Sequence, residues 1–294
     1  MFSVGKMFHL AHLVEDLDAV DRWYDELFGC VRFYRRYEKA AHREASLLVI
    51  SDMIMEPIQP SAAPEAAGTP LGRFKARHGN RLHSLAWYVD DIEACSRELA
   101  ARGIRQVGLT GRPVTDPAKA VAIWTHPADT HALLEFCEPG FAADPRLQAD
   151  WVDTWADHHP LRIQRTSHIT VVVEDLDAAA AVYVDALGGT LLHRDDEHHD
   201  HDRAAFIAVG EETVIHAVAP VGTTTPEGSD LAQSGEGVHA IVFATADLDA
   251  AATFLRAKGQ RLEPSGADTF FINRDDAFGL RVGFTRSPIP NDPR

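Results

Sequence analysis

The segment His9–Asp18 returns, with changes, as His168–Asp177 in the second half of the chain. In both copies a histidine opens an apolar run that ends in Glu-Asp-Leu-Asp, and an amphipathic segment containing an aromatic residue follows. An apolar run, an Asp and a segment with helical periodicity predict a strand, a helix N-cap and a helix, in that order. The chain is therefore a duplication, and a repeated strand–helix unit is the basis of its fold.

Each copy continues with three further short strands, so the repeating unit is βαβββ. In the first unit the expected elements are strands at 7–14, 31–37, 45–50 and 53–58 and a helix at 17–28. The unit closes at two prolines, and the segment 61–69, rich in Ala, Pro and Gly, is typical of a connector.

Four such units are present, because His83–Gly103 also returns in altered form, as His239–Gly259. The residues between the second and third units carry no copy of the pattern, and we expect them to form an arm that joins two domains. The predicted layout is an N-terminal domain at 1–137 with units at 1–60 and 80–137, an arm at 138–165, and a C-terminal domain at 166–294 with units at 166–220 and 236–285.

Charge and composition exclude several classes of partner. The 44 acidic and 28 basic residues give a formal charge of −16, which repels nucleic-acid phosphates and anionic lipid heads. No charged-then-apolar leader opens the chain, and no apolar run approaches the roughly 20 residues of a membrane helix. Three widely separated cysteines are typical of reduced thiols. We expect a cytoplasmic protein that binds a small-molecule substrate. Nucleic acid and membrane are not expected partners, and a homodimer is a possible assembly.

One βαβββ unit cannot cover both faces of its small sheet, because its single helix shields only one. Two units side by side curl into a cup, so the expected fold class is α+β, with four βαβββ units forming two cups. Because side chains alternate between the two faces of a strand, those at the centre of a first strand and at the end of a last strand can point to one place in such a cup. The polar residues at these positions are His9, Glu56, Glu135, His168 and His216.

These five side chains lie within apolar strands, where an unpaired polar group is costly. Imidazole nitrogen and carboxylate oxygen are ligands that a divalent Fe, Mn, Ni, Co or Zn ion accepts, and coordination would satisfy them. Each residue taken alone could equally be a polar strand end that reaches solvent. Their repetition at equivalent places in three of the four units favours a metal or ligand site.

The chain resembles the vicinal oxygen chelate superfamily, which includes glyoxalase I, methylmalonyl-CoA epimerase, the extradiol dioxygenases and the bleomycin resistance proteins. The matching pieces are His-x6-Asp-Leu at His9 and at His168, an aromatic-bearing helix that ends in Gly29 or Gly188, and Leu-Leu-Glu-Phe at 133–136. The resemblance covers nearly the whole chain except the arm. It implies a metal held by first-strand His and last-strand Glu or His residues and chelated in turn by two adjacent substrate oxygens.

The sequence departs from the superfamily pattern at three ligand positions, which hold Ser84, Ala240 and Gly283. His83 and His239 stand one residue before the first two of these positions. A one-residue shift turns a side chain to the other face of a strand, so either histidine reaches the cup only if a bulge restores it. His83 is therefore a weaker candidate ligand than the five residues above.

The ligand sets depend on which units pair. If neighbours pair, the N-terminal cup holds His9, Glu56 and Glu135, and the C-terminal cup holds His168 and His216 without a carboxylate. If units two and three pair across the arm, His168, His216 and Glu135 form the facial set of a non-haem Fe(II) enzyme. We favour neighbour pairing, because it needs no long crossing of the arm.

Three functions stay open. The favoured one is a metal-dependent enzyme with glyoxalase- or epimerase-like chemistry, of lyase or isomerase type, in which Glu56 or Glu135 acts as a base on a small organic substrate with adjacent oxygens. The second is an Fe(II) ring-cleaving-type dioxygenase that uses His168, His216 and Glu135. The third is a non-catalytic protein of the bleomycin-resistance type, whose apolar cup binds a drug or metabolite.

The segment 193–202 is also rich in metal-ligand residue types, His and Asp above all. These residues stand in consecutive positions, without the spacing that lets side chains converge on one ion. We interpret the segment as a solvated hairpin with at most adventitious metal binding.

Overall fold

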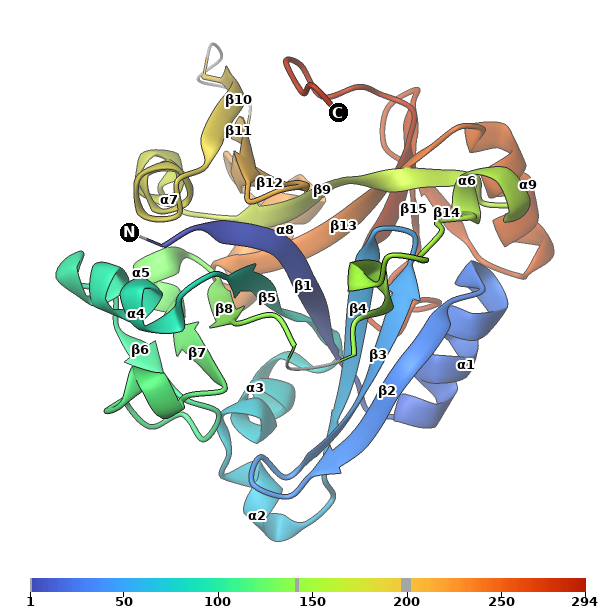
Figure 1. Cartoon of the computed structure of the whole chain (residues 1–294). Coiled ribbons are helices and arrows are strands. Elements are labelled where there is room, and N and C mark those ends of the chain that lie inside the picture. Colours follow the sequence, from blue (N-terminus) through green and yellow to red (C-terminus); the bar gives the residue numbers. More distant parts are fainter. Residues whose placement is uncertain (1, 141–142, 197–201) are drawn as a thin grey trace.

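The computed structural model describes residues 2–140, 143–196 and 202–294, and it contains two eight-stranded sheets (Figure 1). The strand orders are β2-β3-β4-β1-β5-β8-β7-β6 and β10-β11-β12-β9-β13-β16-β15-β14. In each sheet the first strands of two neighbouring units pair antiparallel at the centre, β1 with β5 and β9 with β13. The α+β fold of four units in two cups is thus confirmed. The units pair as neighbours, and the alternative pairing across the arm is wrong.

The first sheet is built from two βαβββ units. The elements of the first unit are β1 (Val4–Leu13), α1 (Leu17–Phe28), β2 (Val31–Glu38), β3 (Arg43–Ile50) and β4 (Met53–Pro60). Those of the second unit are β5 (Arg81–Val89), α4 (Ile92–Ala101), β6 (Gln106–Val107), η1 (Pro117–Lys119), β7 (Ala122–Thr125), α5 (Pro127–Thr130) and β8 (Leu133–Cys137).

Two helices, α2 (Pro64–Ala67) and α3 (Pro70–His78), stand between these units, where we expected only a connector over 61–69. Each begins with a proline, whose fixed φ suits the first helical position and whose missing N–H is not needed there. Thr69 caps α3 by accepting a hydrogen bond from the Gly72 amide. The Pro-rich composition that suggested a loop is therefore the start signal of a helix.

The second sheet repeats this plan. The arm ahead of it contains η2 (Pro145–Leu147) and α6 (Trp155–His158). The third unit comprises β9 (Ile163–Val172), α7 (Leu176–Ala181), η3 (Val182–Ala186), β10 (Thr190–Asp195), β11 (Arg203–Val209) and β12 (Thr213–Ala219). Helix α8 (Pro226–Ser234) precedes the fourth unit, which comprises β13 (Gly237–Thr245), α9 (Leu248–Ala257), β14 (Leu262–Pro264), β15 (Thr269–Ile272) and β16 (Val282–Thr285).

The aspartate that follows each first strand caps the next helix. The side chains of Asp16, Asp91, Asp175 and Asp247 each accept a hydrogen bond from a backbone amide in the first turn of the helix that follows. Such a cap satisfies an amide that otherwise has no partner in the helix. The strand, N-cap and helix expected from the repeated segment are all present.

The described part of the segment 193–202 behaves as a solvated hairpin. Arg194 forms ion pairs with Asp177 and Asp196, all three on the surface or close to it. Arg203 also pairs with Asp196, at 3.0 Å. Residues 197–201 of this segment lie outside the described residues.

Among the residues that the structure describes, no helix has both the length and the apolar character needed to cross a bilayer.

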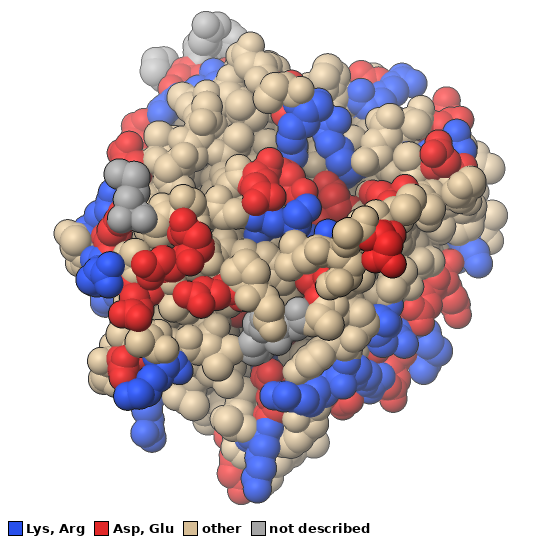
Figure 2. Space-filling model, in the orientation of Figure 1, with Lys and Arg blue, Asp and Glu red and all other residues tan. Residues whose placement is uncertain are grey.

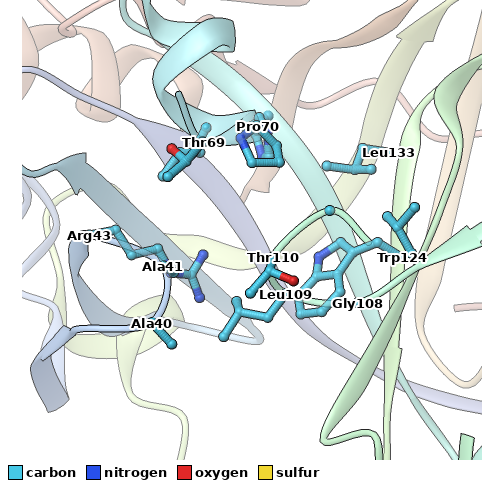
Figure 3. A pocket seen from close by; sticks show the side chains of 14 residues that line it. Ala40, Ala41, Arg43, Thr69, Pro70, Gly108, Leu109, Thr110, Trp124 and Leu133 are labelled. Carbon is cyan, nitrogen blue, oxygen red and sulfur yellow. The ribbon is translucent and has the colours of Figure 1, made fainter. Parts of the chain in front are cut away.

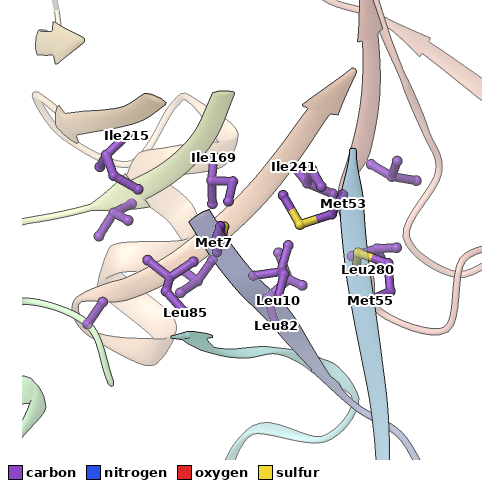
Figure 4. Close-up of a cluster of buried hydrophobic side chains, with 14 of the residues drawn as sticks. Met7, Leu10, Met53, Met55, Leu82, Leu85, Ile169, Ile215, Ile241 and Leu280 are labelled. Carbon is purple, nitrogen blue, oxygen red and sulfur yellow. The ribbon is translucent and has the colours of Figure 1, made fainter. Parts of the chain in front are cut away.

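The faces of the two sheets that turn away from the cups share one hydrophobic core. Met7 and Leu10 of β1 lie in the same buried cluster as Ile169 of β9 and Ile241 of β13 (Figure 4). Helix α1 joins this core through Phe28, whose ring lies 6.2 Å from that of Phe243 and 6.3 Å from that of Phe284. The helix of the first unit therefore packs on the sheet of the second half, and the two halves stabilise each other.

Truncation of this contact tests whether the halves unfold together. Phe28→Ala is expected to lower the free energy of unfolding by about 3–5 kcal/mol, because it leaves a cavity between the halves. Urea unfolding followed by circular dichroism should show one transition that shifts as a whole. Val31→Ala, at a residue 41% exposed, is the control and should change stability by about 0.5 kcal/mol or less. Two separate transitions of which only one moves would contradict a shared core.

Candidate functional site

The first-half cup brings His9, Glu56 and Glu135 together from β1, β4 and β8. Ala86 of β5 pairs with His9 on one side and with Glu135 on the other. Glu56 lies on the opposite side of β1, in register with Ala11. His9 Nδ1 is 3.3 Å from Glu56 Oε2, and His9 Nε2 is 3.5 Å from Glu135 Oε2. All three side chains are buried, so an imidazole stands between two carboxylates away from water.

Mutual charge sets the protonation of this group. Burial alone would lower the pKa of His9, but the carboxylates of Glu56 and Glu135 outweigh burial and raise it. Burial raises the pKa of Glu56, despite the opposing charges of His9 and Arg43. For Glu135 the same burial is outweighed by His9 and Arg43 and by a hydrogen bond from Trp124, so its pKa is lowered. The two carboxyl pKa values are driven apart, which is the pattern of an acid–base pair.

Arg43 and Trp124 hold the two carboxylates. Trp124 Nε1 donates a hydrogen bond to Glu135 Oε2 at 2.9 Å. Arg43 Nη2 lies 3.7 Å from Glu56 Oε1, and Arg43 Nε donates to Glu38 Oε2 at 2.6 Å. A cavity of about 370 Å³ opens beside the group. Arg43 and Trp124 also project, from opposite sides, into an adjoining cavity of about 140 Å³ (Figure 3).

A bulge in β5 turns His83 toward this second cavity. Leu85 pairs with Leu10 and Leu82 with His12, so two residues of β5 stand opposite one residue of β1. His83 lines the cavity of about 140 Å³ together with Arg43. Burial, aided by the Arg43 charge, lowers the pKa of His83 to about 4, so the imidazole is neutral. The sequence predicts that His83 can turn toward the cup only if a bulge shifts the strand register, and this bulge is present.

His168 and His216 also meet, in the second-half cup. Their ring centroids lie 5.1 Å apart, and His216 stacks on Phe206 at 4.2 Å. Burial lowers the pKa of His216 to about 4. Burial also lowers the pKa of His168, well below its ordinary value, and the neighbouring His216 and Arg294 add to the effect. Both imidazoles are neutral.

Aromatic rings line the second-half cup. Phe206 stands at the position that Leu47 has in the first half, and Phe271 at the position of Trp124. Phe271 lies directly opposite Gly283, and a β-carbon at Gly283 would lie 2.6 Å from the Phe271 ring. A side chain at Gly283 would therefore have to displace the Phe271 ring, which occupies the place that a carboxylate at this position would need.

Carboxylates nevertheless reach the second half, from helix α8 rather than from a strand. Asp230 Oδ2 lies 2.8 Å from His239 Nδ1, and Glu227 Oε1 lies 3.4 Å from His239 Nε2. The expected pair His168 and His216 has no carboxylate from the last strand β16; the carboxylates of α8 contact His239 instead, which was not predicted from the sequence. A signal was available, because Thr-Pro-Leu-Gly at 69–72 returns as Thr-Pro-Glu-Gly at 225–228 and marks α8 as the copy of α3.

The corresponding residues of α3 are apolar. Leu71 stands at the position of Glu227, and Phe74 at that of Asp230. The Phe74 ring meets His83 edge-on at 4.6 Å. His239 is therefore hydrogen-bonded to a carboxylate of α8, whereas His83 packs near Leu71 and Phe74 of α3.

The set His168, His216 and Glu135 is not assembled. The two histidines belong to the second sheet and Glu135 to the first, so the dioxygenase site that needed pairing across the arm is wrong. Across residues 2–140, 143–196 and 202–294, no three His, Cys, Asp or Glu side chains are arranged to hold a metal ion as they stand.

Both halves match the same protein superfamily. Residues 8–125 and residues 165–284 each match a family model described as the Glyoxalase/Bleomycin resistance protein/Dioxygenase superfamily. An ethylmalonyl-CoA/methylmalonyl-CoA epimerase from Cereibacter sphaeroides is 32% identical over 105 residues, which are 35% of this chain and 78% of that protein.

A solved structure shows the same fold over almost the whole chain. A mutant 4-hydroxymandelate synthase from Streptomyces coelicolor superposes with a TM-score of 0.67 at 14% identity and covers 96% of this chain and 92% of that one. A methylmalonyl-CoA epimerase from Mycobacterium tuberculosis is 29% identical, covers 44% of this chain and 90% of that one, and has a TM-score of 0.39. The synthase is too distant in sequence to indicate more than the fold.

The duplication predicts what a carboxylate on α3 would do. Leu71→Glu places beside His83 the residue type that His239 has from α8, and it is expected to raise the pKa of His83 from about 4 by roughly one to three pH units. Histidine NMR titration of the metal-free protein measures this pKa. Leu71→Gln is the matched neutral control. Equal His83 pKa values in the Glu and Gln variants would contradict the equivalence of α3 and α8.

Proposed function

Because the chain belongs to the Glyoxalase/Bleomycin resistance protein/Dioxygenase superfamily, we propose that it is a metal-dependent enzyme of the glyoxalase or epimerase type. Its substrate is a small organic molecule with two neighbouring oxygens, and the reaction moves a proton on carbon. The observation that carries this proposal is His9 held between two buried carboxylates whose pKa values diverge. The first-half cup is the reacting one.

The donor types in this cup suit a divalent cation, although among the described residues no three such side chains stand in ligand positions. One imidazole and two carboxylates are the N and O donors that Fe, Mn, Ni, Co and Zn accept. His9 Nδ1 is buried and, among the described residues, has no hydrogen-bond partner. The raised pKa of His9 shows that the carboxylates already favour a positive charge between them. His9, Glu56 and Glu135 would hold the ion, with His83 as a further ligand.

When bound, the ion supplies a Lewis acid that draws electron density from a substrate oxygen and acidifies the adjacent C–H. Glu56 would leave the ion and take that proton, because burial raises its pKa and makes it the better proton carrier of the two carboxylates. Glu135 stays ionised, since its pKa is lowered and Trp124 fixes it by a hydrogen bond. Return of the proton from Glu56 to the neighbouring carbon completes a glyoxalase-type isomerisation, whereas an epimerisation needs its delivery to the opposite face of the same carbon.

A non-catalytic binding protein is the second candidate, and one observation favours it. The cavity of about 370 Å³ is lined largely by apolar and aromatic side chains, including Phe8, Leu47, Val121 and Trp124. Such a cavity binds an apolar ligand without any chemistry. The two candidates differ in their dependence on the carboxylates and on metal.

Metal uptake tests the first candidate. Protein stripped with chelator is expected to take up about one divalent ion per chain, and Glu135→Gln to take up much less, because a ligand is lost. Elemental analysis after dialysis against each metal measures the stoichiometry. His168→Gln removes a partly buried histidine of the second-half cup and should leave uptake unchanged. Wild-type uptake well below one ion per chain would contradict a metal-dependent enzyme.

Proton exchange tests the chemistry. The metal-loaded protein is expected to exchange the α-proton of methylmalonyl-CoA, the thioester named for the relative from Cereibacter sphaeroides, for deuterium in D2O. Glu56→Gln should lower the rate by about 10²–10⁴-fold, because it cannot accept the proton. NMR follows the loss of signal, and Glu93→Gln, exposed on α4, is the control. Ligand binding that survives both chelator and Glu135→Gln, without exchange, would favour the binding protein.

A further inference from the structure

Three adjoining cavities lie along the first half, and the third is also bordered by Ser234, Glu236, Gly237 and Val238 of the second half. The cavity beside His9, Glu56 and Glu135 shares lining residues with the cavity in Figure 3, namely Ala40, Arg43, Gly108, Leu109 and Trp124. That cavity in turn shares residues with a third one of about 470 Å³, namely Pro70, His83, Val107, Gly111 and Leu133. A continuous series of cavities therefore leads from the carboxylates, past Arg43 and His83, to one face of α3.

The third cavity is basic. Arg73 and Arg77, one helical turn apart on α3, line it together with Arg81 of β5. Arg81 is paired with Asp230 at 3.1 Å, whereas the exposed Arg77 has no ion-pair partner among the described residues. Glu236 is the one carboxylate among the described residues that line this cavity, and it is already paired with a histidine.

The positive charge of this cavity contrasts with the charge of the whole chain. Acidic residues outnumber basic ones to give a formal charge of −16. On the face shown in Figure 2, acidic and basic side chains are mixed in small groups. Among the described residues that line the third cavity, three arginines stand against one carboxylate, Glu236. Such a local excess of one sign attracts a ligand of the opposite sign.

Comparison of the two halves shows that the basic residues of the third cavity occur only in the half that contains His9, Glu56 and Glu135. At the positions of Arg73, Arg77, His78 and Arg81, the second half has Ser229, Gln233, Ser234 and Gly237. Helix α8 instead presents carboxylates to its own histidine. The fold therefore does not need the cations, because its second copy forms the same helix without them.

We propose that the third cavity is a subsite for the anionic tail of the substrate. The ligand it takes is an elongated molecule whose far end carries two or more negative charges, as phosphoryl or carboxyl groups. The guanidinium groups of Arg73 and Arg77 bind such oxygens in pairs. The inference rests on the proposed function, because that function locates the reacting end of the substrate at His9.

Calorimetric titration of the full chain with probes in the presence of chelator tests the subsite without turnover. The probes are pyrophosphate, citrate and coenzyme A, which separate a phosphoryl tail from a polycarboxylate and a short anion from a long one. The double variant Arg73→Glu/Arg77→Glu is expected to weaken binding of the preferred probe by roughly tenfold to a hundredfold, because two attractions become repulsions. Raised salt should weaken wild-type binding in the same direction.

Two further variants make the result decisive. Arg97→Glu/Arg256→Glu changes the net charge equally on α4 and α9, outside the three cavities, and should leave affinity unchanged. Arg73→Lys/Arg77→Lys keeps the charge and should retain most of the affinity. Absence of wild-type binding to all three probes, or equal losses in the α3 and control variants, would overturn the subsite.

Failure of the subsite and failure of the proposed function are distinguishable. Glu135→Gln removes a residue of the candidate reacting group and should leave probe binding intact. A protein that binds coenzyme A through α3 but takes up no metal keeps the subsite and loses the metal-dependent reaction. A protein that takes up metal and exchanges protons equally well after Arg73→Glu/Arg77→Glu keeps the reaction and loses the subsite.

Discussion

The antiparallel pairing of two first strands at the centre of each sheet is the constraint on which the rest of the structure depends. β1 borders the last strand of its own unit, β4, and the first strand of the next unit, β5, which in turn borders β8. A residue of β1 is therefore close to the last strands of both units. His9 meets Glu56 and Glu135 for this reason. One unit alone could not assemble the group, because it supplies only one last strand.

The two halves have the same arrangement of strands, but different side chains line their cups. Phe206 and Phe271 line the second-half cup at the positions where Leu47 and Trp124 border cavities in the first half. A cavity beside buried carboxylates costs stability. The proposed function gives a reason for this costly arrangement in the first half. The second half supports the shared core, to which its strands β9, β13 and β16 contribute Ile169, Ile241 and Phe284.

Strand alternation and the duplication were enough to predict the places of His9 and Glu135, because both patterns mark the same positions. They could not decide how units pair, since a βαβββ unit has a free edge that either partner could join. The role of Arg43 beside Glu56 and Glu38 was not predicted, because the position of a residue along a strand does not reveal which buried carboxylate its side chain contacts. Glu227 and Asp230 were missed because a helix packed against a cup is a tertiary contact, which local composition does not report.

The charges along the cavities of the first half give the site a direction. The first cavity holds the buried carboxylates of Glu56 and Glu135 and the His9 imidazole, and its remaining charged lining is mixed, with Glu38, Arg36, Lys39 and Arg43. The third cavity holds Arg73 and Arg77 at the other end. An anionic tail is attracted to Arg73 and Arg77 and is repelled from the two buried carboxylates, which favours one orientation of the substrate. Reversed binding would bury the tail charge beside two carboxylates with no partner, at a cost of on the order of several kcal/mol. The basic cavity therefore favours the orientation that brings the substrate oxygens to His9.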